Sequence, residues 1–450
     1  MRCFLKQNLR RIVIPTALLV IFATPSRSGQ FSKSDRELAN AMLQNAAEDV
    51  RKHYYDPKFH GVDWDARVQG AKTKVEAATS LNVAMSEIAN LLATLNDSHT
   101  YFFPPPLSHV HDYGFQIEMI GQQCYVVRVR HGSDAEKKGL KPGDEVQAIN
   151  ENPVSRQNFA KLIYILNVLR PQTSLRLALA GEAGHTRQVE VITSFKLSPV
   201  NQYFTMQGSN YARRDAQDEL RLLRARYFEK GKDLLVVKIP AFAFSQSGVD
   251  DIIAKMRPHQ GVILDLRGNP GGYLLTLDYL LGGIFDNDLK IYDRVEREST
   301  KPISVKGRHQ SAFTGRFAVL IDSESASASE VLARVIQLQK RGTVIGDRSL
   351  GRAMEAKRYL HQVEFHSRFS YGISVTQADM VMTDGSSLEH LGVAPDVLVL
   401  PTPADLASQR DPVLAKAAEL LGVQISPEEA GKILPYQENE QFDTPLSLND

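Results

Sequence analysis

The feature that most restricts the fold is an alternation of short apolar runs and helical patterns between residues 215 and 402. Wholly apolar runs are typical of strands buried on both faces, and strands alternating with helices are typical of a parallel sheet. We therefore predict a βαβ core, with strands at 234–239, 261–266 and 317–322 and helices at 247–256 and 330–340.

Two further regions precede this core. Residues 32–105 carry apolar side chains at four-residue steps (Leu38, Met42, Ala46, Val50), which indicates helices. Residues 112–196 follow three consecutive prolines and contain β-branched runs at 124–129 and 146–150. The predicted fold class is a multidomain α/β chain: an N-terminal helical bundle, a small β domain, the core, and a C-terminal helix with a loose tail over 403–450.

The first 28 residues have the pattern of a secretory signal peptide. They hold five basic residues and no acid, and residues 12–24 are almost wholly apolar. A membrane anchor is the alternative, but 13 apolar residues are fewer than the roughly 20 that a spanning helix needs. We expect an exported chain, periplasmic or extracellular, without an integral membrane span once residues 1–28 are removed.

The charge balance and the cysteine count restrict which binding partners and which cross-links we expect. With 53 Lys and Arg against 52 Asp and Glu the net charge is +1, and the mature chain would carry 48 against 52. Nucleic-acid-binding proteins usually have a cationic excess, so we expect no nucleic-acid partner. Only Cys124 would remain after export, so we expect no internal disulfide and a buried apolar thiol.

A cluster of alternating serines is the first candidate for chemistry. Ser325-Ala326-Ser327-Ala328-Ser329-Glu330 lies between an apolar run and a predicted helix. Free backbone amides at a helix start can stabilise an oxyanion, which would make a serine there a nucleophile. The alternative is helix capping, but one serine would be enough for that.

A glycine-containing segment is the second candidate. Asp265-Leu266-Arg267-Gly268-Asn269-Pro270-Gly271-Gly272 follows a central strand. Glycines there let a bound chain approach the backbone, so the segment could form the second half of an oxyanion hole. A plain turn is the alternative.

Together these two motifs, behind a helical region and a small β domain, resemble the serine peptidases of the carboxyl-terminal processing (tail-specific) and tricorn-core family. The resemblance covers about residues 35 to 400 and implies a ClpP/crotonase-like core. It also implies that Ser327 is the nucleophile, with oxyanion donors at Ala328 and at Gly271 or Gly272.

One departure from that family changes the expected base. The processing proteases use a lysine 25 residues after the nucleophile, whereas this chain has Arg352. Because a guanidinium stays protonated, Arg352 cannot be a general base.

The tricorn-like branch of the family offers a replacement base. It has a Ser-His pair near the end of the helical domain, which corresponds to Ser98 and His99, and a glutamate near the closing motif, which corresponds to Glu389. The resemblance therefore implies His99 as base and Glu389 as its orienting acid, with Asp97 and Asp384 as competitors. Ser98 would orient the histidine or polarise the substrate.

The β domain resembles a PDZ domain, because Leu-Lys-Pro-Gly-Asp at 140–144 leads into a strand. In PDZ domains the position of Tyr113, Gly114 and Phe115 binds a peptide carboxyl end through backbone amides. A generic small β domain is the alternative.

The sequence thus predicts an exported serine endopeptidase with a Ser327–His99–Glu389 relay, acting on peptides or proteins, including their C-terminal ends. We expect no metal and no organic cofactor. A non-catalytic peptide-binding pseudo-protease is the alternative function. The substrate and the oligomeric state stay open.

Overall fold

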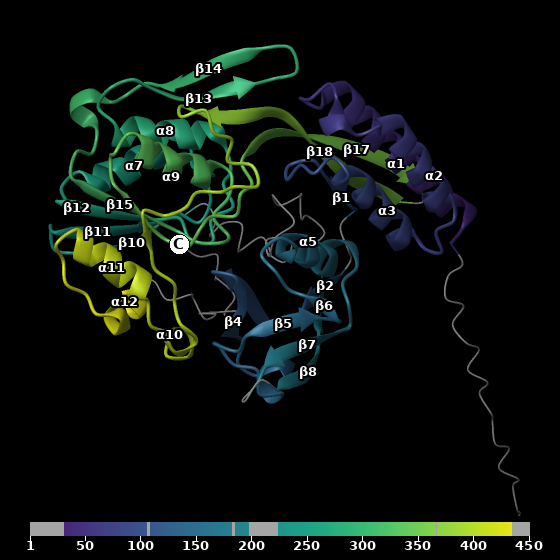
Figure 1. Ribbon diagram of the computed structural model, residues 1–450, viewed down its shortest axis with the longest axis horizontal. Helices are drawn as coiled ribbons and strands as arrows, with labels where there is room; N and C mark the ends of the chain where they lie inside the picture. Colours follow the sequence, from purple (N-terminus) through teal and green to yellow (C-terminus); the bar gives the residue numbers. More distant parts are fainter. Residues whose placement is uncertain (1–30, 106–108, 182–184, 198–223, 366, 434–450) are drawn as a thin grey trace, which may run out of the picture.

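The computed structural model describes residues 31–105, 109–181, 185–197, 224–365 and 367–433. The predicted signal peptide, the start of the predicted core at 215–223 and the tail from residue 434 lie outside these ranges. Figure 1 shows three parts: helices at one side, a large α/β part at the other, and a small β part between and below them.

The N-terminal part consists of three helices, α1 (Lys33–His53), α2 (Trp64–Glu76) and α3 (Leu81–Ala93), with a 3-10 turn at Phe59–Gly61. Ser32 caps α1 because its side chain accepts from the backbone N–H of Asp35 at 3.0 Å. The apolar faces of the three helices are not buried by one another alone. They share one buried cluster with Tyr371, Ile373 and Val375, which come from a strand of the distant C-terminal half.

The small β part has a core of its own, and the one cysteine of the described ranges, Cys124, lies in it. Burial raises the pKa of this thiol above its ordinary value. The elements are β2 (His109–Asp112), β3 (Phe115–Ile120), β4 (Gln123–Val129), α4 (Asp134–Lys137), β5 (Val146–Ile149), β6 (Asn152–Pro153), α5 (Phe159–Tyr164) with a π-turn at Ile165–Leu169, β7 (Ser174–Ala180), β8 (Thr186–Ile192) and β9 (Ser194–Leu197).

The large part is built on the predicted sheet, with strand order β10-β11-β12-β15-β16-β19. All neighbouring pairs are parallel except β10 and β11. The strands are β10 (Arg226–Lys230), β11 (Leu234–Lys238), β12 (Gly261–Asp265), β15 (Arg316–Ile321), β16 (Thr343–Gly346) and β19 (Val397–Leu398).

Helices cover both faces of this sheet. Alternate side chains of β11 and β12 fall into two separate buried clusters, as expected for strands buried on both sides. One cluster includes residues of α7 (Gln246–Met256), α8 (Leu274–Ile284) and α9 (Ala328–Leu338). The other includes α11 (Pro412–Leu420) and α12 (Pro427–Ile433), which follow the short α10 (Pro403–Ala407).

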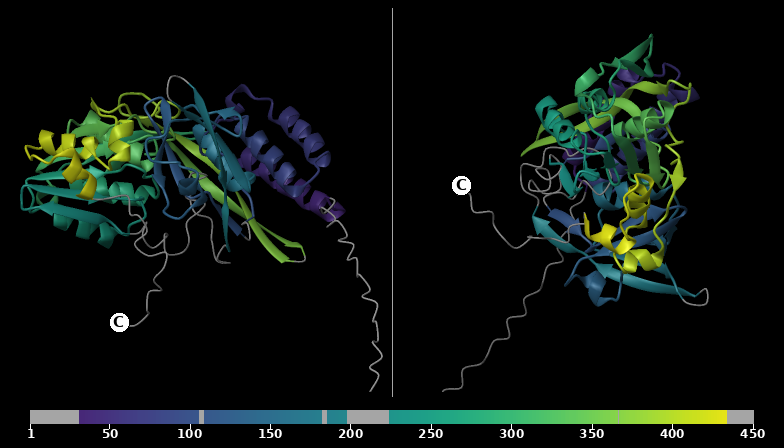
Figure 2. Two further views of the ribbon diagram at one scale, coloured as in Figure 1. Left: turned by 90° about the horizontal axis from the view of Figure 1, so that it is seen from below. Right: turned by 90° about the vertical axis from the view of Figure 1, so that its left-hand side faces the viewer.

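A long hairpin connects the large part to the helices. It consists of β17 (Met354–Phe365) and β18 (Ser367–Met382), and it forms a second sheet with β1 (Tyr101–Phe103), β13 (Leu289–Val295) and β14 (Thr300–Val305). Figure 2 shows the hairpin extending from the α/β part to the helices. Since β1 pairs with β18, the residues just before β1, including His99, are attached to the large part.

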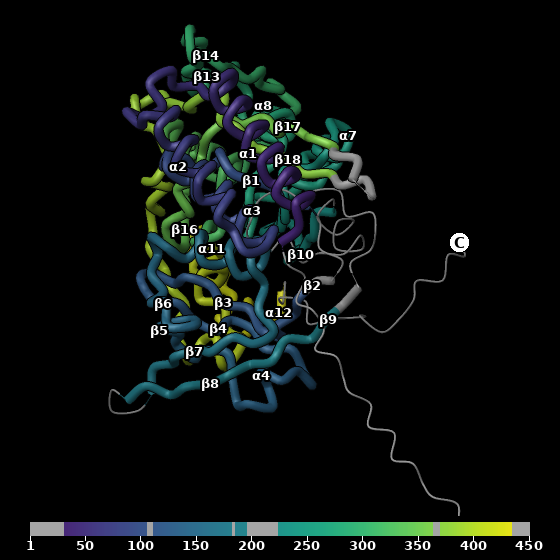
Figure 3. Tube along the Cα trace, turned by 90° about the vertical axis from the view of Figure 1, so that its right-hand side faces the viewer, coloured from purple at the N-terminus to yellow at the C-terminus, as the bar shows by residue number. Residues whose placement is uncertain are grey.

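The small β part also contacts the large part, and Figure 3 shows the two adjoining below the helices. Arg156 forms an ion pair with Asp347 at 2.9 Å, and the same carboxylate accepts from the backbone N–H of Gly121 at 2.9 Å. The hydroxyl of Ser323 donates to the carbonyl of Met119 at 2.5 Å. These bonds place the β part next to the loop that leads into β17.

Candidate active site

The two motif segments leave the same edge of the sheet side by side. They follow β12 and β15, which are parallel neighbours with Asp265 opposite Leu320. The backbone N–H of Gly268 donates to Oδ1 of Asp322 at 2.9 Å, and that of Ala326 donates to the carbonyl of Asn269 at 3.0 Å. The structure therefore brings the two predicted segments into direct contact.

The two outer serines of the cluster bind the segments together. Ser325 donates from its hydroxyl to the carbonyl of Leu266 at 2.9 Å, and Ser329 donates to that of Asn269 at 3.0 Å. Both serines are fully buried. Ser325 and Ser329 therefore have structural roles. Ser327 is the serine of the cluster that remains as a candidate nucleophile.

Ser327 has a strained backbone at the start of α9. Its φ of 56° and ψ of −120° are rare for a residue with a side chain. Ser327 can pack closely in this conformation because the residue opposite it, Gly271, has no side chain. A Cβ added to Gly271 would lie 2.6 Å from Cβ of Ser327.

A buried carboxylate holds this strained position. Glu330 accepts from the backbone N–H groups of Ser327 (2.9 Å), Gly351 (2.7 Å) and Arg352 (2.9 Å), and from the hydroxyl of Ser349 (2.6 Å). Burial raises the pKa of Glu330 to about 7, and the hydrogen bonds from these donors oppose that rise. Because Glu330 ties the start of α9 to the loop before β17, it fixes the position of Ser327.

Two backbone amides beside Ser327 have no acceptor among the described residues. They are those of Gly272 and of Ala328, the first residue of α9. The third predicted donor differs, because the N–H of Gly271 donates to Oδ1 of Asn269 at 2.8 Å. Of the three predicted oxyanion donors, the amides of Gly272 and Ala328 are therefore the two that have no acceptor in the described ranges.

Ser98 joins the other two predicted residues. Its hydroxyl donates to Oε2 of Glu389 at 2.8 Å and lies 2.9 Å from Nδ1 of His99. Its backbone N–H donates to Oε1 of Glu389 at 2.8 Å. Since the single hydroxyl hydrogen goes to Glu389, Nδ1 of His99 carries the proton and Nε2 has a free lone pair. Glu389 thus contacts His99 through Ser98, not directly.

The competing acids have other roles. Asp97 accepts from the backbone N–H of His99 at 2.8 Å and from the hydroxyl of Thr376 at 2.6 Å, so it holds the main chain against β18 and not the ring. Asp384 is bonded to Arg334 and to the hydroxyl of Ser386.

The imidazole of His99 lies in an environment that favours its neutral form. Only 7% of the residue is exposed, and Nε2 is buried with no hydrogen-bond partner in the described part of the chain. Burial lowers the pKa of His99 to about 4, the charge of Asp97 opposes this, and the charge of Arg352 adds to it. A neutral imidazole with a free Nε2 can accept a proton.

Two consecutive residues connect the serine to the histidine group. The carbonyl of Arg352 accepts from the backbone N–H of Ser327 at 2.7 Å. The backbone N–H of Ala353 donates to Oε2 of Glu389 at 3.2 Å. The five predicted residues Ser98, His99, Ser327, Ala328 and Glu389 therefore gather around one short stretch of chain.

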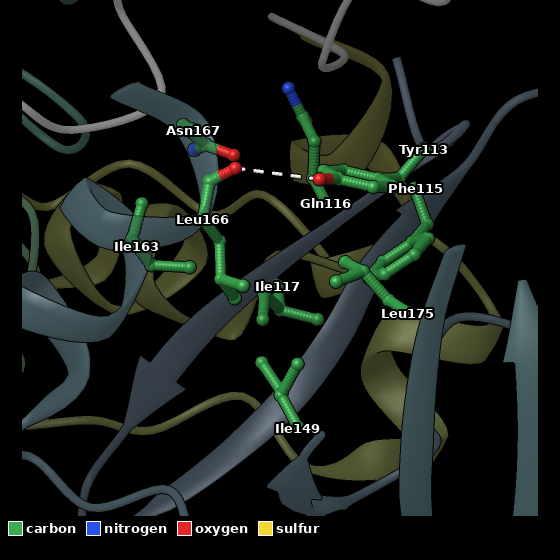
Figure 4. A pocket seen from close by; sticks show the side chains of 9 residues that line it. All are labelled: Tyr113, Phe115, Gln116, Ile117, Ile149, Ile163, Leu166, Asn167 and Leu175. Carbon is green, nitrogen blue, oxygen red and sulfur yellow. Dashed lines mark hydrogen bonds between the residues drawn. The ribbon is translucent and has the colours of Figure 1, made fainter. Parts of the chain in front are cut away.

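The predicted peptide-binding segment lines an apolar pocket in the small β part. Tyr113, Phe115 and Leu166 face this pocket, which lies between β3 and the α5 region and encloses about 20 Å³ (Figure 4). The hydroxyl of Tyr113 donates to the carbonyl of Leu166 at 3.4 Å. The N–H of Gly114 already donates to Oδ1 of Asp112 at 2.9 Å, so a ligand carboxylate would have to compete with that acid.

Three segments of the chain match models of known protein families. Residues 233–399 match the model for peptidase family S41, which covers the sheet edge with Ser327 and Glu389. Residues 36–69 match the tricorn protease C1 domain, and residues 106–164 match the PDZ domain. Over residues 233–399 the chain is similar to peptidase family S41. It is a serine peptidase of mixed α/β fold, with a PDZ domain and an S41 core.

Two relatives of this chain are named as processing proteases. The chain is 24% identical over 371 residues to carboxyl-terminal-processing peptidase 3, chloroplastic, of Arabidopsis thaliana, covering 77% of this chain and 66% of that protein. It is 22% identical over 399 residues to the carboxy-terminal processing protease CtpA of Bacillus subtilis (strain 168), covering 86% and 76%.

Solved structures show the same fold. Mature CPAF in complex with lactacystin superposes with a TM-score of 0.59 at 16% identity, covering 86% of this chain and 97% of that chain. The photosystem II D1 C-terminal processing protease gives a TM-score of 0.50 at 19% identity, covering 88% and 100%.

Two features are absent from the described ranges. No helix there is long and apolar enough to cross a membrane. Nor do those ranges contain a group of three or more His, Cys, Asp or Glu residues that could hold a metal ion.

Sequence reasoning missed three contributions to this site. The serine motif ends in Glu330, whose role the sequence does not reveal, although a glutamate three residues after a helix-capping serine is placed to accept from the serine's amide. The β17–β18 hairpin was not predicted, although Tyr371, Ile373 and Val375 alternate with a period of two. The backbone hydrogen bonds of Arg352 to Ser327 and of Ala353 to Glu389 could not be predicted from any sequence pattern.

Proposed function

We propose that this chain is an endopeptidase in which Ser327 is the nucleophile and His99 is the general base, oriented by Glu389 through Ser98. One observation carries the proposal: Nδ1 of His99 contacts a hydroxyl that already donates to a carboxylate, while the buried Nε2 has no partner in the described ranges. That arrangement is the one a histidine needs to take a proton from serine.

The reaction follows from these positions. Ser327 Oγ forms a bond to the carbonyl carbon of a peptide while its proton passes to Nε2 of His99. The amides of Gly272 and Ala328 stabilise the oxyanion that develops. Cleavage of the C–N bond then releases an amine, which takes the proton from Nε2. Water hydrolyses the acyl-enzyme by the same steps and restores Ser327.

The substrate class is peptides and proteins, and the relatives' names support processing near carboxyl ends. The PDZ domain would hold an extended peptide beside β3, whose described pairing is to β4 alone. Tyr113 and Phe115, which line the apolar pocket, and Gly114 between them would then bind the peptide while another part of it reaches Ser327.

Export is a separate part of the proposal. It rests on the basic start, the apolar stretch and the small-residue exit within residues 1–28. Sequencing the amino terminus of the protein recovered from cell fractions tests it. A mature chain that begins near residue 29 in an exported fraction supports export, and an intact amino terminus in the cytosol contradicts it.

Cleavage of an unfolded protein substrate tests the activity. Wild-type protein should produce new termini, whereas Ser327→Ala and His99→Ala should reduce kcat by a factor of about 10³ or more. Ser247→Ala and His131→Ala are matched controls, because both residues are exposed and lie outside the site. Folded wild-type protein that binds peptides without cleaving them would instead indicate a pseudo-protease.

A further inference from the structure

Arg352 is positively charged, lies at the candidate site and has no partner for its guanidinium among the residues that the structure describes. Its backbone is fully engaged, because the N–H donates to Glu330 and the carbonyl accepts from Ser327. Its side chain is only partly exposed. In the described part of the chain, however, no hydrogen bond or ion pair is made by the guanidinium.

The carboxylates nearest to this cation are already engaged. Glu389 accepts from the backbone N–H and the hydroxyl of Ser98 and from the N–H of Ala353. Glu330 accepts from a hydroxyl and three backbone amides. Both acids are close enough for their charge to act on Arg352, but their oxygens serve other donors. A guanidinium with five N–H donors is thus left without an acceptor within the described ranges.

The position of Arg352 relative to the reacting groups is fixed by its main chain. Its carbonyl is bonded to the backbone of Ser327, and the next residue is bonded to Glu389. The charge of the guanidinium also reaches His99 and Tyr101. A second cation is nearby, since the guanidinium of Arg358 lies 4.1 Å from the ring centroid of Phe103, which belongs to the same strand as Tyr101.

We propose that Arg352 is a specificity-determining residue that binds a substrate carboxylate close to the scissile bond. This inference rests on the proposed function. A partly buried, unpaired guanidinium is costly to keep, and a carboxylate matches its planar fork through two parallel hydrogen bonds. The carboxylate comes either from an Asp or Glu side chain or from the free carboxyl end of the substrate.

Matched peptides distinguish these two sources. One pair carries Glu or Gln beside the cleaved bond, and a second pair ends in a free carboxylate or in an amide near that bond. We expect wild-type protein to prefer the carboxylate member of one pair by roughly 10- to 100-fold in kcat/KM, the range of hydrogen bonds to charged groups. The pair that shows the preference identifies the source.

Variants test the role of Arg352 in that preference. Arg352→Met should bring the ratio close to 1, and Arg352→Lys should restore part of it, because lysine keeps the charge and loses the fork. Arg348→Met is the matched control and should keep the wild-type ratio, since Arg348 lies in the same loop but is exposed. A wild-type ratio near 1, or a preference that survives Arg352→Met, overturns the inference.

Binding separates this inference from the proposed catalysis. In the Ser327→Ala background, calorimetry with the same peptides should show tighter binding of the carboxylate member, and this difference should vanish when Arg352→Met is added. If the binding difference is present but wild-type protein cleaves nothing, the proposed function fails and the carboxylate site stands. If cleavage occurs without a binding or kinetic difference, the carboxylate site fails and the function stands.

Discussion

Ser98 and His99 are consecutive residues whose side chains also meet, with Ser98 Oγ 2.9 Å from Nδ1 of His99. The same hydroxyl donates to Glu389, so Ser98 transmits the position and charge of a distant carboxylate to the ring. The two residues belong to the N-terminal part, whereas Glu389 belongs to the S41 core. The group is complete only when the two parts are packed together.

Replacing Ser98 tests this connection. Ser98→Ala removes the acceptor for Nδ1, so the ring is free to adopt the wrong tautomer, and we expect kcat to fall at least tenfold with little change in KM. Ser98→Thr keeps the hydroxyl and should retain most of the activity. Steady-state kinetics on one peptide measures both. Equal losses in the two variants would show that the hydroxyl is not what matters.

The pH dependence of kcat/KM tests the environment of His99. Its pKa is lowered from 6.5 to about 4, first by burial and then by the charge of Arg352, against the effect of Asp97. The imidazole is therefore neutral above about pH 4, and activity should persist between pH 5 and 6.5, where an exposed histidine would be protonated. Because Glu330 has a pKa of about 7, the contradicting result is an acid limb near or above pH 6.5 that persists in Glu330→Gln, where that group no longer titrates.

The pKa of His99, and with it the acid limb of the pH profile, should also depend on the charge of Arg352. Removing the positive charge in Arg352→Met makes protonation of His99 easier, so its acid limb should move to higher pH. Arg348→Met should leave the limb unchanged. Profiles of kcat/KM between pH 4 and 8 measure the shift. An unchanged limb in Arg352→Met would mean that the guanidinium does not act on the ring.

Glu330 offers a stability prediction. Glu330→Gln replaces one acceptor oxygen by an NH₂ group facing backbone donors, so at least one buried N–H loses its partner. We expect a loss of about 2–3 kcal/mol in the free energy of unfolding, together with reduced kcat. Urea unfolding of the variant against the exposed control Glu298→Gln measures the first effect. A loss no larger than the control would contradict the role of the carboxylate.

Gly271 offers a packing prediction. Gly271→Ala would place a Cβ 2.6 Å from Cβ of Ser327 and 2.9 Å from the N–H of Ala328, so it should displace both and reduce kcat by more than tenfold. Gly385→Ala is the control, because Gly385 also has positive φ but open space around it. It shares the backbone strain without the clash. Similar activities of the two variants would contradict the close approach.

The sequence predicted those parts of the fold that depend on local patterns. The buried strands 234–239, 261–266 and 317–322 agree with β11, β12 and β15 to within a residue at each end. Their wholly apolar character is a direct consequence of burial on both faces. Because parallel neighbours end at one edge, the contact between the two motifs could also be expected.

The rest depends on long-range contacts that a single sequence does not display. The β17–β18 hairpin carries His99 to the core by pairing β18 with β1, about 270 residues away in the chain. The indirect contact of Glu389 through Ser98 depends on side-chain positions that no spacing encodes. Glu330 is ionisable yet fully buried, which its four hydrogen-bond donors explain.

The most direct test is to map the site of covalent labelling by a fluorophosphonate. Intact-mass measurement and peptide sequencing of the labelled full chain should find one adduct on Ser327, strongly reduced in His99→Ala and unchanged in Ser247→Ala. An adduct on another serine, or undiminished labelling of folded Ser327→Ala, would contradict the account.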